Sequence, residues 1–198
     1  MYKLYFMPNA CSLATQVILR ELQQPFTLIR RDQVQNYAEL NPANQVPLLR
    51  TDKQAISEGA AIILFLLQQH PNRWTDGQWP DLDQLQDLLF ANATMHPAYS
   101  KLFFLAGAEM SPGDKNSLLQ NAAQRINTLW QVVEQRLQYQ PFLAGSAAGV
   151  ADILLTVYQR WDQFFDLPIV QGPLTQKMLA TVRALPSFQA ALAAEQAA

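Results

Sequence analysis

The sequence predicts an α/β domain followed by an all-helical domain, and two observations support this fold class. The first 75 residues alternate between extended and helical patterns of apolar residues. Beyond residue 80 the apolar patterns are helical and no convincing strand appears. The stretch between them, 73–80, contains Asp76, Gly77 and Pro80 and has the composition of a connector. We therefore expect one domain at residues 1–75 and a second at residues 82–198.

The first domain alternates strands with helices. Its expected elements are a strand at 2–7, a helix that continues to residue 22, a strand at 26–31, a hairpin formed by 46–51 and 54–57, and a helix at 59–70. The first helix begins after a turn at Pro8 and Asn9, and the last one ends at Pro71. This order of elements predicts a thioredoxin-like domain.

Five helices are expected in the second domain. They lie near 83–110, 114–139, 150–165, 175–184 and 187–196. Pro97 falls inside the first of them and removes a backbone hydrogen bond, so we expect a kink there. His96 immediately precedes Pro97. A lone histidine most often packs in the core, but a kink can also present it to a pocket.

Composition and charge exclude several classes of protein. A hydrophobic fraction of 49% with 15% charged residues indicates an ordered globular chain. The net charge of -2, with Arg30 and Arg31 as the single adjacent basic pair, provides no footprint for nucleic acid or an anionic membrane. The apolar run at 60–67 is far too short to span a bilayer, so we expect a soluble, cytoplasmic protein. His70 and His96 have no metal-ligand spacing, and no metal is expected.

Cys11 is the single cysteine and lies where the first strand gives way to a helix. Unpaired N–H groups and the positive end of the helix dipole favour a thiolate there, although a small residue filling a tight turn is an equally good interpretation. Without a second cysteine, disulfide exchange needs an external thiol. Ser12 is a candidate donor to the sulfur, but helix capping is its commoner role. Tyr5 is a further candidate, although strand aromatics are mostly packed.

Two later segments are suited to an extended ligand. A cis peptide bond before Pro47 would turn the backbone groups of Val46 outward to pair with a ligand backbone, although most such bonds are trans. Glu58 and Gly59 stand at a helix N-terminus, where N–H groups can hold a carboxylate while Glu58 pairs with an amine. Helix capping is the alternative. The first interpretation suits the α-amino acid end of a peptide.

Taken together, these segments resemble the glutathione transferases, most closely the bacterial beta class. The matching segments, in the family's order, are Lys3-Leu4-Tyr5, Pro8 through Leu13, Leu19-Arg20-Glu21, Asn41-Pro42, Gln45-Val46-Pro47, Ser57-Glu58-Gly59, Ala61-Ile62, His96, Tyr99-Ser100 and Val150-Ala151-Asp152. Each is weak alone. The combination of Cys11-Ser12, Gln45-Val46-Pro47 and Glu58-Gly59 at these separations is specific.

The resemblance implies an enzyme that conjugates glutathione, its co-substrate, to small hydrophobic electrophiles, with a role in detoxification and a homodimeric assembly. It makes Cys11 and His96 the catalytic residues, with Cys11 contacting the glutathione sulfur and able to form a mixed disulfide with it. The implied glutathione-binding residues are Ala10, Cys11, Val46, Pro47 after a cis bond, Glu58, Gly59, Thr94 and His96. The candidates for lining the electrophile site are Tyr99, Phe103 and Trp161, with core packing favoured for Phe103.

The chain departs from the class at three places. The loop at 32–41 is short and contains no lysine, so a cationic contact to the glycyl carboxylate of glutathione is expected to be absent. Leu89 stands where the class often has asparagine. Gly149 replaces the Ser or Thr of a capping box, although Asp152 can still reach a backbone N–H. Two alternatives stay open: a glutathione-dependent disulfide reductase or peroxidase, and a non-catalytic interaction protein of the same fold.

Overall fold

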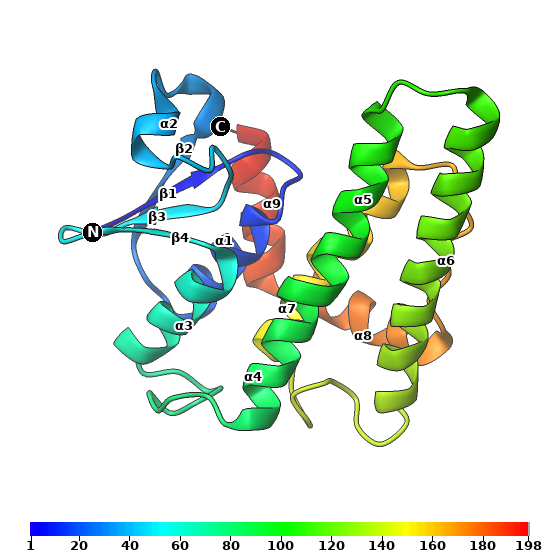
Figure 1. The fold of residues 1–198 in the computed structure, drawn as a ribbon. Helices are drawn as coiled ribbons and strands as arrows, with labels where there is room; N and C mark the ends of the chain where they lie inside the picture. The colour runs from blue at the N-terminus through cyan, green and yellow to red at the C-terminus, as the bar shows by residue number, and fades with distance from the viewer. Residues whose placement is uncertain (198) are drawn as a thin grey trace. The chain divides into compact units, whose positions relative to one another are not determined.

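A four-stranded sheet forms the centre of the N-terminal part of the computed structural model, which describes residues 1–197 (Figure 1). Its strands are β1 (Tyr2–Phe6), β2 (Phe26–Arg30), β3 (Leu48–Arg50) and β4 (Ala55–Ser57), in the spatial order β2-β1-β3-β4. β1 pairs in parallel with β2, whereas β3 is antiparallel to both β1 and β4. The parallel pair and the hairpin confirm the predicted thioredoxin-like arrangement.

Helices pack on this sheet to complete the first of two units. They are α1 (Ser12–Glu21), α2 (Tyr37–Leu40), α3 (Gly59–Gln69) and α9 (Pro186–Ala197), with a single 3-10 turn, η1 (Arg31–Gln33), after β2. Every residue of α1 from 12 to 19 is buried, because the sheet, α3 and α9 all pack against it. The short helix α2 lies in the polar stretch for which no element was expected.

The division of the chain differs from the expected domains at both ends of the second one, which was expected at 82–198 and is found at Gln86–Val182. One unit comprises residues 1–85 together with the segment from Arg183 onward, and the other comprises Gln86–Val182. The last helix therefore groups with the N-terminal unit instead of the helical one expected at 82–198. The reason is its packing on α1, where hydrogen bonds join Glu195 to Gln16 and Ser187 to Glu21.

The second unit is helical, as expected. It contains the end of α4 (Leu82–Leu89), then α5 (His96–Gly107), α6 (Pro112–Arg136), α7 (Val150–Gln159), the 3-10 turn η3 (Arg160–Phe164) and nearly all of α8 (Pro173–Arg183). Trp130, Tyr99 and Tyr158 are among its largest fully buried side chains. No helix within residues 1–197 combines the length and apolar character needed to cross a membrane.

The predicted kink near Pro97 takes the form of a π-helical segment. Residues Phe90–Met95 (η2) separate α4 from α5, so one long expected helix is three consecutive segments. Proline at 97 cannot donate to the helix, and its ring crowds the carbonyl of Ala93, four residues earlier. The wider π turn accommodates this crowding.

Candidate functional site

Cys11 occupies the turn between β1 and α1, as predicted. It is the residue just before the first residue of α1, and its side chain is partly buried. Its Sγ donates a hydrogen bond to the carbonyl oxygen of Val46, 3.3 Å away. Two segments that are 35 residues apart in the sequence therefore meet at the sulfur.

The surroundings of Cys11 favour the thiol over the thiolate. The pKa of the Cys11 thiol is raised to about 11, chiefly by burial and to a smaller extent by the nearby Glu58 carboxylate. The N–H groups of Cys11 and Ser12 lower this pKa, but by less than burial raises it. The expectation that the helix start stabilises a thiolate is therefore wrong for this state of the protein, because desolvation outweighs the helix dipole.

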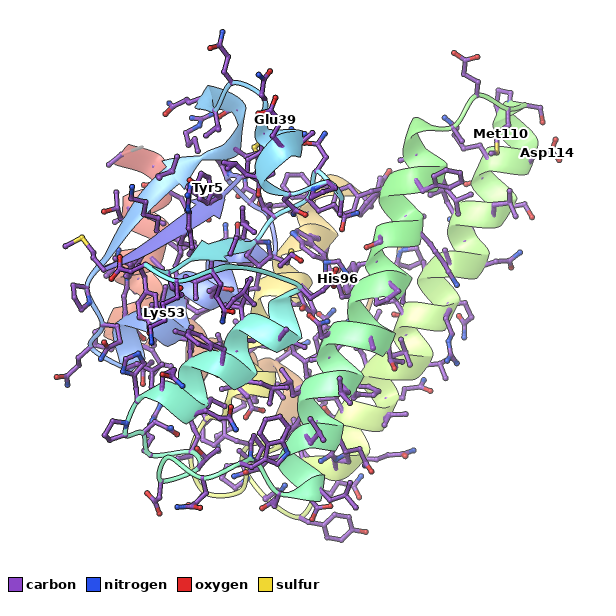
Figure 2. All side chains as sticks on the ribbon, turned by 60° about the vertical axis from the view of Figure 1, so that its left-hand side comes forward. Tyr5, Glu39, Lys53, His96, Met110 and Asp114 are labelled. Carbon is purple, nitrogen blue, oxygen red and sulfur yellow. The ribbon has the colours of Figure 1, made fainter. Side chains whose placement is uncertain are left out.

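Among the described residues, neither Ser12 nor Tyr5 donates a hydrogen bond to the Cys11 sulfur, which is bonded to the Val46 carbonyl instead. The Ser12 hydroxyl, fully buried, donates to the Met7 carbonyl oxygen and accepts from the Met7 N–H, each at 3.4 Å. It closes the turn, and the predicted capping of the helix is not its role, since no side-chain bond caps α1. Tyr5 lies on the sheet (Figure 2), where its ring packs on Tyr37 and Leu48.

The Val46–Pro47 bond is cis, as the resemblance implied. Pro47 is buried and Val46 is partly buried at the start of the hairpin. The carbonyl of the preceding residue, Gln45, accepts hydrogen bonds from the Tyr37 hydroxyl and from the Asn41 amide, both at 2.9 Å. This segment is therefore fixed from two sides next to Cys11.

Glu58 has a backbone conformation that non-glycine residues rarely adopt. Its φ is 70° directly before Gly59, the first residue of α3. Its side chain is exposed and makes no capping hydrogen bond, so the capping interpretation fails for the side chain. Strained backbone of this kind is retained mostly at functional sites, which favours the ligand-binding interpretation.

His96 lies at the start of α5 in the second unit (Figure 2), where aromatic rings surround it. Its ring centroid is 5.1 Å from that of Tyr158 and 5.3 Å from that of Trp161. Burial lowers the pKa of His96, so the imidazole is neutral at neutral pH. Its Nδ1 lies 3.4 Å from the Ser100 hydroxyl. Thr94, partly buried, precedes it within the π-helical segment.

The three candidates for the electrophile site lie together but differ in exposure. Phe103 and Tyr99 both pack edge-on against Trp161, with centroid distances of 5.7 and 5.8 Å. Tyr99 is fully buried, and its hydroxyl donates to Asp162 at 2.7 Å and accepts from Trp130 Nε1 at 2.9 Å. Phe103 is 44% exposed, the reverse of the core packing expected for it. Tyr99 and Trp161, which is 5% exposed, are core residues and line no open surface.

Sequence reasoning missed two charged residues beside the turn and the hairpin. The Arg31 guanidinium lies over the Tyr37 ring, 5.6 Å from its centroid, and Arg31 directly precedes the 32–41 loop in which no cationic contact was expected. Glu195 reaches the Cys11 turn from α9, and its isolation as the last acidic residue of an alanine-rich helix was the available signal. Among residues 1–197, no three His, Cys, Asp or Glu side chains are grouped as metal ligands.

Comparisons with known proteins find relatives over most of the chain's length. A family model described as the N-terminal domain of glutathione S-transferase matches residues 11–74. Glutathione S-transferase GST-4.5 of Xanthomonas campestris pv. campestris is 32% identical over 166 residues, which cover 80% of this chain and 81% of that protein. The match thus extends well beyond the sheet-containing unit.

Two solved structures are similar over nearly the full length. A sphingomonad glutathione S-transferase complexed with glutathione has a TM-score of 0.84 at 27% identity, and the alignment covers 99% of this chain and 100% of that one. The bacterial beta-class glutathione S-transferase of Sphingomonas chungbukensis also has a TM-score of 0.84, at 26% identity and 98% coverage of both chains.

Proposed function

Because the chain belongs to the glutathione S-transferase family and is thus a glutathione transferase, we propose that it conjugates glutathione to small hydrophobic electrophiles, with Cys11 at the glutathione sulfur. The observation that supports the role of Cys11 is the 3.3 Å hydrogen bond from Sγ to the Val46 carbonyl. The same two residues are those that the resemblance assigns to glutathione. A ligand backbone paired with Val46 would therefore carry its own sulfur close to Cys11.

Glutathione is a tripeptide whose γ-glutamyl end carries both an amine and a carboxylate. The start of α3 offers free N–H groups for the carboxylate, and the exposed Glu58 carboxylate offers a partner for the amine. Ala10, Pro47 and Gly59 complete this part of the proposed site in the first unit. The resemblance adds His96 and Thr94 from the second unit.

We assign Cys11 the role of hydrogen-bond donor to the glutathione sulfur. A thiol whose pKa is about 11 is protonated at neutral pH and can donate to a glutathione thiolate, which it thereby stabilises as the attacking nucleophile. In the conjugation step the glutathione sulfur forms a bond to the electrophilic carbon and the leaving group departs with its electron pair. A donor at the sulfur lowers the pKa of the bound thiol.

Mixed-disulfide formation is the slower proposed reaction. With oxidised glutathione, the Cys11 thiol loses its proton to solvent, the Cys11 sulfur attacks one glutathione sulfur, and the S–S bond breaks to release one glutathione thiolate. Because this attack requires the thiolate, the raised pKa of Cys11 disfavours it at neutral pH. The same pKa argues for conjugation over a disulfide-reductase activity.

For the electrophile we propose Phe103 as the lining residue, with the buried Trp161 and Tyr99 supporting it from the core. Phe103 also packs against Phe164, which is 48% exposed, with ring centroids 6.1 Å apart, so an exposed aromatic surface continues beyond it. Aromatic packing of this kind suits an apolar, aromatic second substrate. Homodimeric assembly, a cytoplasmic location and a role in detoxification belong to the same proposal.

The test is conjugation of glutathione to chlorodinitrobenzene, with glutathione binding measured by calorimetry. We expect binding and turnover by the native chain and a lower turnover for Cys11→Ala with glutathione binding retained. Glu58→Gln should weaken glutathione binding, because the amine loses its charged partner. Absence of both binding and turnover in the native chain would overturn the proposal, and an unchanged turnover in Cys11→Ala would remove Cys11 from it.

A further inference from the structure

The turn that carries Cys11 is held from more than one side. Asn9 takes a left-handed conformation with φ of 61°, which asparagine tolerates better than most residues. The Ala10 N–H donates to the Met7 carbonyl at 3.2 Å, and the Ser12 hydroxyl bonds to both backbone groups of Met7. These contacts are local and fix the two ends of the turn. The N–H of Asn9, in its middle, is bonded elsewhere.

The partner of the Asn9 N–H is a buried carboxylate from the far end of the chain. Glu195 Oε2 accepts this N–H at 3.0 Å, and Glu195 Oε1 accepts from Gln16 Nε2 at 2.8 Å. Glu195 is 8% exposed and Gln16 is fully buried. A carboxylate that accepts an N–H gives a stronger hydrogen bond than a neutral acceptor does. One side chain of α9 thus connects the turn to the interior of α1.

We propose that Glu195 is a positioning residue for the reaction, which holds the turn so that the Cys11 sulfur stays aimed at the Val46 carbonyl and at the glutathione that would pair there. This inference rests on the proposed function. Asn9 is only two residues from Cys11, so a shift of its peptide group displaces the sulfur directly. Small displacements of a reacting group are costly to an enzyme because its geometry must be held closely.

The arrangement around Gln16 provides a rescue variant. Among the described residues, Gln16 Oε1 is buried and has no hydrogen-bond partner. In Glu195→Gln, the new amide oxygen can accept the Asn9 N–H while its NH2 group donates to Gln16 Oε1, once the Gln16 amide is rotated by 180°. Glu195→Gln should therefore keep the turn in place, whereas Glu195→Ala removes both bonds. In Glu195→Asp, the side chain is one methylene too short to make both hydrogen bonds.

The other end of α1 provides a matched control. There the Ser187 hydroxyl of α9 donates to Glu21, which also pairs with Arg73. Ser187→Ala removes a bond between the same two helices without touching the Cys11 turn. It should lower the melting temperature of the chain and leave its kinetics unchanged.

The experiment measures KM for glutathione, kcat and melting temperature for the native chain and the four variants. Glu195→Ala and Glu195→Asp should raise KM for glutathione by about fivefold or more, the loss of roughly one hydrogen bond, and Glu195→Gln should stay within about twofold of the native value. If Glu195→Ala does not fold, the Asp and Gln variants decide the result. If Glu195→Ala and Glu195→Asp keep the native KM wherever they fold, or if Ser187→Ala raises KM equally, Glu195 is merely structural and the inference fails. A native chain that binds no glutathione would instead overturn the proposed function.

Discussion

The chemistry of Cys11 is set by its neighbours more than by its place at a helix start. Helix N-termini lower the pKa of a thiol by offering N–H groups and a positive dipole end, and both are present at α1. Removal of the sulfur from water acts in the opposite direction, and the Glu58 carboxylate adds to it. The rise in pKa caused by desolvation is larger than the fall caused by the helix start, so Cys11 keeps its proton and serves as a hydrogen-bond donor.

The pH dependence of Cys11 alkylation tests this directly. Below its pKa of about 11, the thiolate fraction rises tenfold for each pH unit, so the rate of reaction with iodoacetamide should rise in the same way from pH 7 to pH 10. Intact mass gives the rate, and Cys11→Ala controls for other nucleophiles. A plateau at or below pH 8 would contradict the raised pKa.

Arg31 tests the cationic contact that sequence reasoning considered absent. Its guanidinium lies over Tyr37, whose hydroxyl bonds the residue next to Val46, and its Nε is buried with no hydrogen-bond partner among the described residues. We expect Arg31→Ala to raise KM for glutathione by about fivefold to tenfold, with kcat little changed, because the cation that we propose as partner of a glutathione carboxylate is lost.

Arg30 is the matched control for this prediction. It is already paired with Asp32 through two hydrogen bonds of 3.1 and 2.6 Å, on an exposed part of the strand end. Arg30→Ala should leave KM for glutathione within about twofold of the native value, since an exposed ion pair contributes little. Equal effects from the two arginines would show that general positive charge, and not the position of Arg31, matters.

At the scale of elements, the start of α7 shows why Gly149 stands where a capping box has Ser or Thr. Asp152 accepts from the Gly149 N–H at 2.8 Å and from the Leu143 N–H at 3.0 Å, which confirms that the acidic half of the capping box is retained. A Cβ on Gly149 would lie 2.5 Å from Ala144 Cβ. Serine or threonine therefore does not fit here, because the preceding loop occupies the space.

Restoring the capping serine should consequently destabilise the chain. We expect Gly149→Ser to lower the free energy of unfolding by about 1–3 kcal/mol through overpacking against Ala144. In the double variant Ala144→Gly/Gly149→Ser the clash is absent, and most of the loss should be recovered. Urea denaturation of the single and double variants measures both. A stable Gly149→Ser would mean that the loop moves aside at no cost.

The Asp152 carboxylate makes the stability of the fold at α7 dependent on pH. Burial raises the pKa of Asp152 to about 6, and Asp87 also contributes, although N–H groups of Gly149, Leu143 and Ala144 act against it. The folded state therefore holds a proton that the unfolded state releases near pH 4. This contribution to stability is complete below pH 4 and is lost as pH rises through about 6.

We expect the loss to amount to about 3 kcal/mol, from a shift of roughly two pKa units. Between pH 4.5 and pH 7, the free energy of unfolding should fall less in Asp152→Asn than in the native chain, because the asparagine does not titrate. Asp83→Asn, on the exposed face of α4, serves as the control. Identical pH profiles for the native chain and Asp152→Asn would exclude this role for the carboxylate.

At the scale of the whole molecule, the end of the chain completes the unit formed by its beginning. α9 buries Phe188 and Ala191 and is bonded to α1 at both ends, through Glu195 and through Ser187. Its removal would expose one side of α1, a helix with a continuous run of eight buried residues. The N-terminal unit is therefore not independent of the last helix.

Truncation before Pro186 tests this dependence. We expect the shortened chain to lose protection of the amides of β1 and α1 in hydrogen exchange, because apolar surface on α1 becomes exposed to water. Phe188→Ala, which empties a fully buried position in the same helix, should show a weaker form of the same effect. Gln196→Ala, at an exposed position, should show none. Full protection in the truncated chain would contradict the dependence.

The sequence by itself determined the kind and order of the main elements and the segments to which the proposed site is assigned. Strand and helix periods are local properties, so β1, α1, the hairpin and the long helices follow from the pattern of apolar residues. Cys11, Val46, Pro47 and Glu58 were singled out by their places at a turn, a strand start and a helix start, and the resemblance supplied their roles toward glutathione. The short α2 and the π-helical form of the kink were missed, because four to six residues carry too little pattern.

The tertiary structure alone decided the protonation of Cys11, the partner of Ser12, the exposure of Tyr99 and Phe103, and the unit to which α9 belongs. Each depends on desolvation or on a bond between residues that are distant in sequence. Cys11 is hydrogen-bonded to Val46, 35 residues away in the sequence, and Asn9 is hydrogen-bonded to Glu195, 186 residues away. A local pattern contains no information on such contacts, and these contacts determine the energy of a buried charge or hydrogen bond.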